Sequence, residues 1–218
     1  MHPLLKEIEV VGFDLDQTLY PDSDEIRDRV RTEIARRILK KIPSLENIEK
    51  AREYFEENYK ELKGGYKVLE KAGYENGRSV MDECLANANV VDIISPDEEL
   101  GKTIELLSRK YILFLITSSP EKLALEKLEK IKINPAHFHI KLFSDTSKNL
   151  SKKDGSSFKH LLGLTNKPPE KHVYIGDKLD SDILPPKNLG MKTISVWKEI
   201  SDASITIKNI NEIKELLL

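Results

Sequence analysis

From Pro96 to the C-terminus, short apolar runs rich in β-branched residues alternate with segments of helical periodicity. The pattern predicts strands at 111–117, 139–144, 172–176, 191–197 and 205–207, and helices at 98–108, 120–130, 156–162, 181–188 and from residue 211 onward. Strands that alternate with helices pair in parallel, and the helices then cover both faces of the sheet. We therefore expect an α/β fold built on a doubly wound parallel sheet.

The N-terminal part of the chain breaks this alternation. Residues 7–15 read as one buried strand, but helices are then predicted at 23–41, 44–62, 66–71 and 79–88 with no strand between them. The first strand needs partners and belongs with the later sheet. The sequence thus predicts a discontinuous core, residues 1–20 and 96–218, with an all-helical cap domain inserted at residues 21–95.

Composition excludes several classes of partner. Among 218 residues, 35 Lys and Arg balance 37 Asp and Glu, so there is no general basic field for nucleic acid. The longest apolar run, Tyr111 to Ile116, is far too short for a membrane span, and Cys84 has no partner for an internal disulfide. The N-terminus lacks the pattern of a signal peptide, and we expect a cytoplasmic protein.

Polar side chains follow the predicted strands, where ligands bind in folds of this kind. They are Asp14, Asp16, Thr117, Ser118, Asp145, Asp177 and Asp182. Taken singly, each short motif also fits an N-cap or a turn. Carboxylates that converge on one edge of a sheet repel one another unless a cation lies among them, and an all-oxygen ligand set suits Mg²⁺.

The order of these motifs resembles that of the haloacid dehalogenase (HAD) superfamily. The segments are FDLDQTLY (13–20), LITSS (115–119), KKDGSSF (152–158) and IGDKLDSD (175–182). They span the whole predicted core, and the helical insertion directly after the first segment resembles the cap of that superfamily. The resemblance implies a Rossmann-like core and a phosphate-handling active site at the strand ends.

The resemblance also implies roles for the acidic residues. Asp14 is expected to be the nucleophile that forms a phosphoaspartyl enzyme, and Asp16 the general acid and base. Magnesium is expected to bind the carboxylates of Asp14 and Asp177 and the backbone carbonyl of Asp16, with Asp182 as a further direct or water-mediated ligand.

The remaining motif residues are expected to contact the phosphate. Thr117 and the backbone of Ser118 are expected to donate hydrogen bonds to phosphoryl oxygens. Lys152 is the motif lysine by its spacing from Phe158, and Lys153 is the alternative; Asp154 matches the acid of the same motif. Thr18 is expected to stabilise the turn that presents the aspartates.

These roles predict a Mg²⁺-dependent phosphomonoesterase, because Asp16 supplies the acid that ester cleavage needs. A phosphomutase and a non-catalytic phosphate-binding module are the alternatives. The substrate is a small phosphate monoester. The segment at 54–74 has a modest resemblance to the cap of pyrimidine 5′-nucleotidase-like members, and phosphoglycolate or a triose phosphate fits equally well.

Three further features carry no functional assignment. The Lys-rich helix at 121–132 is expected to present a solvated face. His137 and His139 flank a predicted strand and are expected to be packing or surface residues, since Mg²⁺ prefers oxygen. The oligomeric state is left open.

Overall fold

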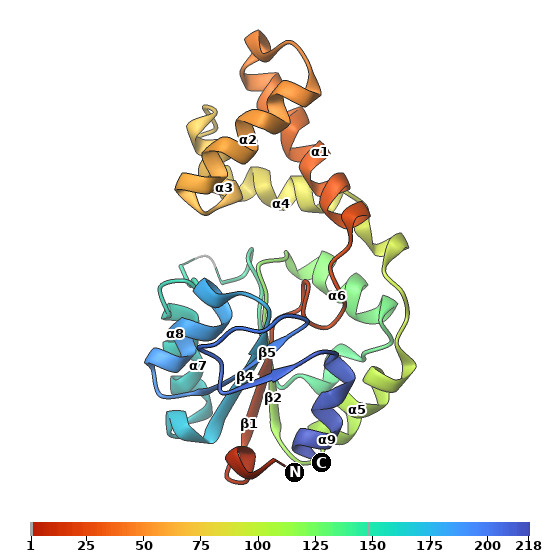
Figure 1. The fold of residues 1–218 in the computed structure, drawn as a ribbon, viewed down its shortest axis with the longest axis vertical. Helices are drawn as coiled ribbons and strands as arrows, with labels where there is room; N and C mark the ends of the chain where they lie inside the picture. The colour runs from red at the N-terminus through yellow and green to blue at the C-terminus, as the bar shows by residue number, and fades with distance from the viewer. Residues whose placement is uncertain (1, 148) are drawn as a thin grey trace. The chain divides into compact units, whose positions relative to one another are not determined.

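A computed structural model describes residues 2–147 and 149–218. The chain divides into two compact units, one formed by residues 1–21 and 94–218 and the other by residues 22–93. The first unit holds all the strands of the described chain, and the second is helical (Figure 1). Within the described residues, no helix combines the length and the apolar character that a membrane crossing requires.

The larger unit contains a six-stranded parallel sheet with the strand order β3-β2-β1-β4-β5-β6. The strands are β1 (Val10–Phe13), β2 (Ile112–Ile116), β3 (Ile140–Leu142), β4 (His172–Gly176), β5 (Lys192–Val196) and β6 (Ile205–Ile207). This is the doubly wound order of Rossmann-like folds, and it confirms the predicted fold class. The strand order reverses between β1 and β4, which is where ligands bind in such sheets.

Helices cover both faces of this sheet, with α7 and α8 on one side and α5, α6 and α9 on the other (Figure 1). Their bounds are α5 (Glu98–Ser108), α6 (Glu121–Lys130), α7 (Ser156–Thr165), α8 (Leu184–Asn188) and α9 (Ile213–Leu217). Strands β1 and β4 are buried along their whole length, as expected for central strands of a two-sided sheet.

Gly12 in the middle of β1 sets the packing of one sheet face. It lies in register with Phe114 on β2 and Tyr174 on β4, whose rings stack with centroids 5.7 Å apart. A Cβ atom at Gly12 would lie 1.8 Å from the Phe114 ring. The absent side chain therefore lets the two aromatic rings meet across β1, and Phe158 from α7 packs edge-on against Tyr174 at 4.9 Å.

The smaller unit consists of α1 (Asp24–Lys41), α2 (Ile48–Leu62), α3 (Gly65–Lys71) and α4 (Gly77–Asn87). Ser23 caps α1 by accepting a hydrogen bond from the backbone of Ile26, and Pro43 follows soon after the end of that helix. Apolar residues of all four helices form one core, including Ile38, Phe55 and Leu69. This unit thus has a hydrophobic core of its own.

Candidate active site

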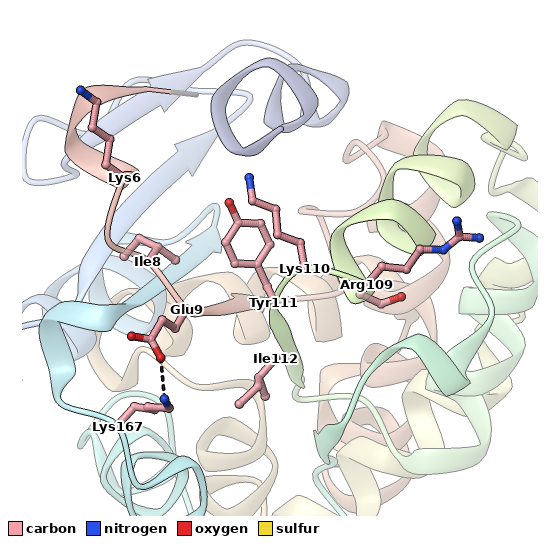
Figure 2. Close-up of a pocket in the computed structure, with 9 residues that line it drawn as sticks. Lys6, Ile8, Glu9, Arg109, Lys110, Tyr111, Ile112 and Lys167 are labelled. Atoms are coloured by element: carbon pink, nitrogen blue, oxygen red, sulfur yellow. Dashed lines mark ion pairs between the residues drawn. The ribbon is translucent and has the colours of Figure 1, made fainter.

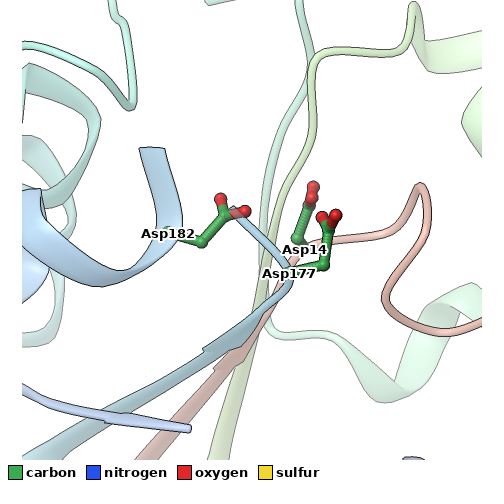
Figure 3. A group of neighbouring side chains, drawn as sticks. All are labelled: Asp14, Asp177 and Asp182. Carbon is green, nitrogen blue, oxygen red and sulfur yellow. The ribbon is translucent and has the colours of Figure 1, made fainter. Parts of the chain in front are cut away.

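Three carboxylates gather where β1 and β4 end. Asp14 follows β1, Asp177 follows β4, and Asp182 lies in the π-helical turn Leu179–Ile183 that begins shortly after β4. Each offers an oxygen atom within 4.8 Å of the others, and all three residues are buried (Figure 3). The sheet therefore brings together three of the residues that the sequence predicted for a metal site.

Gly176 allows Asp182 to reach this cluster. A Cβ atom on Gly176 would lie 2.3 Å from the Cβ atom of Asp182, so any larger residue would displace the Asp182 side chain. The backbone N–H of Lys178 donates a hydrogen bond to Oδ2 of Asp182 at 3.0 Å. The fully buried carboxylate thus fits against Gly176 and is held by the Lys178 backbone, although it is separated from β4 by five residues of sequence.

Lys152 neutralises part of this negative charge. Its ammonium group lies 2.8 Å from Oδ1 of Asp14 and 2.7 Å from Oδ1 of Asp182. Burial alone would lower the pKa of Lys152, but Asp14 and Asp182 raise it well above its ordinary value, so the side chain is a cation. Lys153, by contrast, pairs with Asp180 and is half exposed, and Asp154 accepts a hydrogen bond from the Ser156 backbone at the start of α7.

The protein charges leave a deficit of positive charge at Asp14 and Asp177. Burial raises the pKa of Asp14 to about 7, an effect that Lys152 opposes and the Asp182 carboxylate reinforces. Burial likewise raises the pKa of Asp177. Oδ1 of Asp177 is buried and has no hydrogen-bond partner among the described residues, although the ammonium group of Lys178 lies 3.9 Å away, and Oδ2 lies 3.3 Å from that of Lys198. An all-oxygen donor set in which one buried carboxylate oxygen accepts no hydrogen bond from the described residues fits a hard divalent cation such as Mg²⁺.

The Asp16 side chain lies outside this cluster. Its two carboxylate oxygens bind four other side chains, from Tyr20, Thr117, Ser119 and Lys127. Burial alone would raise the pKa of Asp16, but Lys127, Tyr20 and Ser119 outweigh it and hold the pKa below its ordinary value. The predicted acid–base residue is therefore a fixed carboxylate in this structure.

Among the predicted phosphate-binding residues after β2, Thr117 and Ser118 have different environments. Thr117 is buried; its hydroxyl donates to Oδ2 of Asp16 at 3.2 Å and accepts from the backbone N–H of Ser119 at 3.0 Å. Ser118 is exposed. Ser119, which the sequence reasoning passed over, is buried and donates to Asp16 at 2.7 Å.

Two residues that the sequence placed at or near this site make contacts outside the carboxylate cluster. Asp145 was expected to join the carboxylates at the strand ends, but it accepts a hydrogen bond from the Glu121 backbone at the start of α6. Thr18 was expected to stabilise the turn that presents the aspartates; its carbonyl accepts a hydrogen bond from the Trp197 indole at 3.2 Å. The buried Thr18 hydroxyl has no hydrogen-bond partner among the described residues.

Residues on α6 and after β5 were missed by the sequence reasoning. The Lys-rich helix was expected to present a solvated face, but Lys127 lies on its buried side, is 2% exposed and pairs with Asp16. Lys198 follows β5 and pairs with Asp177. The rule that polar residues after strands line the site would have found Lys198.

Other polar features lie away from the carboxylate cluster. An open cavity of about 390 Å³ lies at the opposite ends of β1 and β2, and its Lys167 is already paired with Glu9 (Figure 2). His137 lies 3.3 Å from Ser108, and His139 accepts a hydrogen bond from the Leu113 backbone. Both histidines thus have local contacts with neighbouring elements.

Comparison with known proteins identifies the family. Residues 8–190 match the model of the haloacid dehalogenase-like hydrolase family, and the chain belongs to that family. This confirms the resemblance stated from the motifs and the predicted enzyme class, a hydrolase of the phosphatase type.

A curated relative and two solved structures give the range of similarity. Glyceraldehyde 3-phosphate phosphatase of Methanocaldococcus jannaschii is 30% identical to the chain, and the match covers 96% of each protein. A HAD phosphatase of Thermococcus onnurineus shares 17% identity and superposes with a TM-score of 0.70 over 96% of this chain and 98% of that one. A putative β-phosphoglucomutase of Thermotoga maritima shares 20% identity, with a TM-score of 0.61 over 96% and 98%. The two structures establish the shared fold.

Proposed function

We propose that this protein is a Mg²⁺-dependent phosphatase that hydrolyses a triose phosphate through a phosphoaspartyl intermediate on Asp14. The observation that carries the proposal is the buried cluster of Asp14, Asp177 and Asp182 with Lys152 among them. The substrate class is supported by the full-length relative named for its action on glyceraldehyde 3-phosphate.

The charges of the site favour an anionic substrate only when a cation is present. Asp14, Asp177 and Asp182 carry up to three negative charges, and Lys152 contributes one buried positive charge. Lys178 and Lys198 pair with Asp177 from half-exposed positions, where water screens their charges. Mg²⁺ bound by these carboxylates and by the Asp16 carbonyl would polarise the phosphoryl oxygens and offset the remaining negative charge. Lys152 and the Thr117 hydroxyl would contact those oxygens, together with the Ser118 backbone.

The chemistry then takes two displacements. In the first, a carboxylate oxygen of Asp14 bonds to phosphorus, the ester P–O bond breaks, and Asp16 gives a proton to the departing oxygen. In the second, Asp16 takes a proton from water as the water oxygen bonds to phosphorus. The bond between phosphorus and Asp14 breaks, and inorganic phosphate leaves. Asp16 must therefore gain a proton when substrate binds, because the structure holds it as a carboxylate.

The experiment is a product assay on glyceraldehyde 3-phosphate with Mg²⁺. Triose phosphates also lose phosphate spontaneously by elimination, so phosphate release alone is not sufficient. Enzymatic hydrolysis yields glyceraldehyde, and in water labelled with heavy oxygen the label appears in the phosphate. Elimination yields methylglyoxal and unlabelled phosphate.

Asp14→Asn is the control variant and should show no turnover, and EDTA should abolish the turnover of the wild type. A panel with phosphoglycolate, dihydroxyacetone phosphate and nucleoside monophosphates tests the substrate class. Preference for a nucleotide would overturn the triose assignment. Isomerisation of a sugar phosphate without phosphate release would instead indicate a mutase.

A further inference from the structure

Lys127 is the most deeply buried ammonium group near the candidate acid–base residue. It lies on α6 with 2% of its surface exposed, although lysine is among the residues least often found in protein interiors. Its neighbours on the same helix, Leu123, Ala124 and Leu128, are buried apolar residues. Lys127 thus occupies a core position of α6, and its head group reaches the carboxylate of Asp16.

The contacts of Lys127 close a ring around that carboxylate. The ammonium group donates to Oδ1 of Asp16 and, at 2.9 Å, to Oγ of Ser119. The Ser119 hydroxyl in turn donates to Oδ2 of Asp16 at 2.7 Å. Lys127 therefore holds one oxygen of the carboxylate and Ser119 the other, and the bond between these two side chains fixes the rotation of the carboxylate about its Cβ–Cγ bond.

Two further donors complete the arrangement. The Tyr20 hydroxyl binds Oδ1, and the Thr117 hydroxyl binds Oδ2 at 3.2 Å. Neither spans the two oxygens, so neither can replace the ring that Lys127 and Ser119 form. Thr117 is also a proposed phosphate contact, and its hydroxyl is expected to turn toward substrate. Lys127, Ser119 and Tyr20 then remain to hold Asp16 in place, and of these only the bonded pair Lys127 and Ser119 bridges its two oxygens.

Packing alone gives no reason for a lysine at this position. Removing an ammonium group from water costs several kcal/mol, and an apolar side chain of similar length fills a core position without that cost. The one acidic group within reach of Lys127 that is described here is Asp16. The ion pair with Asp16 therefore offsets the desolvation cost of Lys127. The orientation of the Asp16 carboxylate decides which of its oxygens faces the reacting group.

We propose that Lys127 is a positioning residue that holds the Asp16 carboxylate in its reactive orientation. The proposal rests on the function proposed above. In both displacements the proton moves between Asp16 and an oxygen attached to, or attacking, phosphorus. A misplacement of about 1 Å in such a group lowers the rate up to about 100-fold.

The test is a double-mutant cycle with Asp16→Asn, Lys127→Met and the combined variant, assayed on the alkyl phosphate glyceraldehyde 3-phosphate with Mg²⁺. Lys127→Met should lower kcat by about 10- to 100-fold with little change in KM. Because Lys127 acts through Asp16, adding Lys127→Met to Asp16→Asn should lower kcat no further. Lys127→Arg should recover part of the lost activity, since it restores a cation at the same place.

Lys122→Met on the same helix is the control, because the Lys122 side chain is 92% exposed. Thermal unfolding of every variant shows whether a loss of activity comes from a loss of fold. If Lys127→Met alone unfolds, the combined variant, which lacks both charges of the buried pair, is compared with Asp16→Asn instead. A Lys127→Met enzyme with unchanged kcat, or additive losses in the cycle, would overturn the role of Lys127 while leaving the phosphatase intact. A wild-type protein that hydrolyses no phosphate ester would overturn both proposals together.

Discussion

Replacing Asp14 with Asn should stabilise the metal-free protein at neutral and alkaline pH. Asp14 is 3% exposed and shares its surroundings with Asp182 and Asp177. Burial, opposed by Lys152 and reinforced by the Asp182 carboxylate, raises the pKa of Asp14 and so favours its protonated form, and Asn mimics that form without the charge. The site is therefore expected to be strained by its own carboxylates until a cation binds, as is common where function competes with stability.

The pKa of Asp14 sets the size of this effect. Its rise from 3.8 to about 7 corresponds to about 4 kcal/mol. A carboxyl group whose pKa is raised in the native state does not lower the free energy of unfolding at a pH below the pKa that it has in the unfolded chain. The cost develops as the pH rises through that value toward the folded pKa, and it is complete above pH 7. Asn also gives up the ion pair with Lys152, so about 4 kcal/mol is a ceiling.

The assay is urea unfolding of wild type and Asp14→Asn in EDTA across pH 4 to 8. The variant should match wild type near pH 4 and exceed it by about 1 to 4 kcal/mol at pH 8. Excess Mg²⁺ should reverse the order, because the ion stabilises the protein that binds it more tightly. Asp180→Asn, an exposed carboxylate nearby, is the control. The reasoning would be refuted if the difference in unfolding free energy between the variant and wild type were no larger at pH 8 than at pH 4.

Two further substitutions test the geometry of the cluster. Gly176→Ala places a Cβ atom 2.3 Å from that of Asp182, and it should weaken Mg²⁺ binding by about 10- to 100-fold in a calorimetric titration. Unchanged affinity would show that Asp182 has no part in holding the ion. Lys152→Met should reduce kcat by about 100-fold or more, whereas Lys153→Met should leave it near wild type in the same steady-state assay. Equal losses in the two variants would remove the distinction between the lysines.

The core of the site follows from strand ends and spacing. Asp14 and Asp177 directly follow the two strands that flank the reversal in strand order, and the parallel sheet brings them together. The buried runs of β1 and β4 indicate central strands, so their ends meet at one edge. Lys152 lies far from both in sequence; motif spacing indicated it as a phosphate contact, and its pairing with Asp14 is seen only in the structure.

Lys127 shows where sequence reasoning failed and which signal was available. Seven lysine and glutamate residues in the run 121–132 suggested a solvated face, and this high overall polarity hid the apolar stripe of the helix. Lys127 lies four residues after Leu123 and four before Ile131, both of which are buried. Helical spacing therefore placed it on the core face, although only the fold reveals that Asp16 lies opposite.

The most direct test of the central claim is to trap the covalent intermediate on Asp14. Asp16→Asn retains the nucleophile but lacks the base for the second displacement. An aryl phosphate, whose leaving group needs no proton, should therefore load this variant with a phosphoryl group that persists through acid quenching. Peptide mapping by mass spectrometry is predicted to place that group on Asp14, and the double variant Asp14→Asn, Asp16→Asn should remain unmodified. A phosphoryl group on another residue, or turnover without any covalent adduct, would contradict the account.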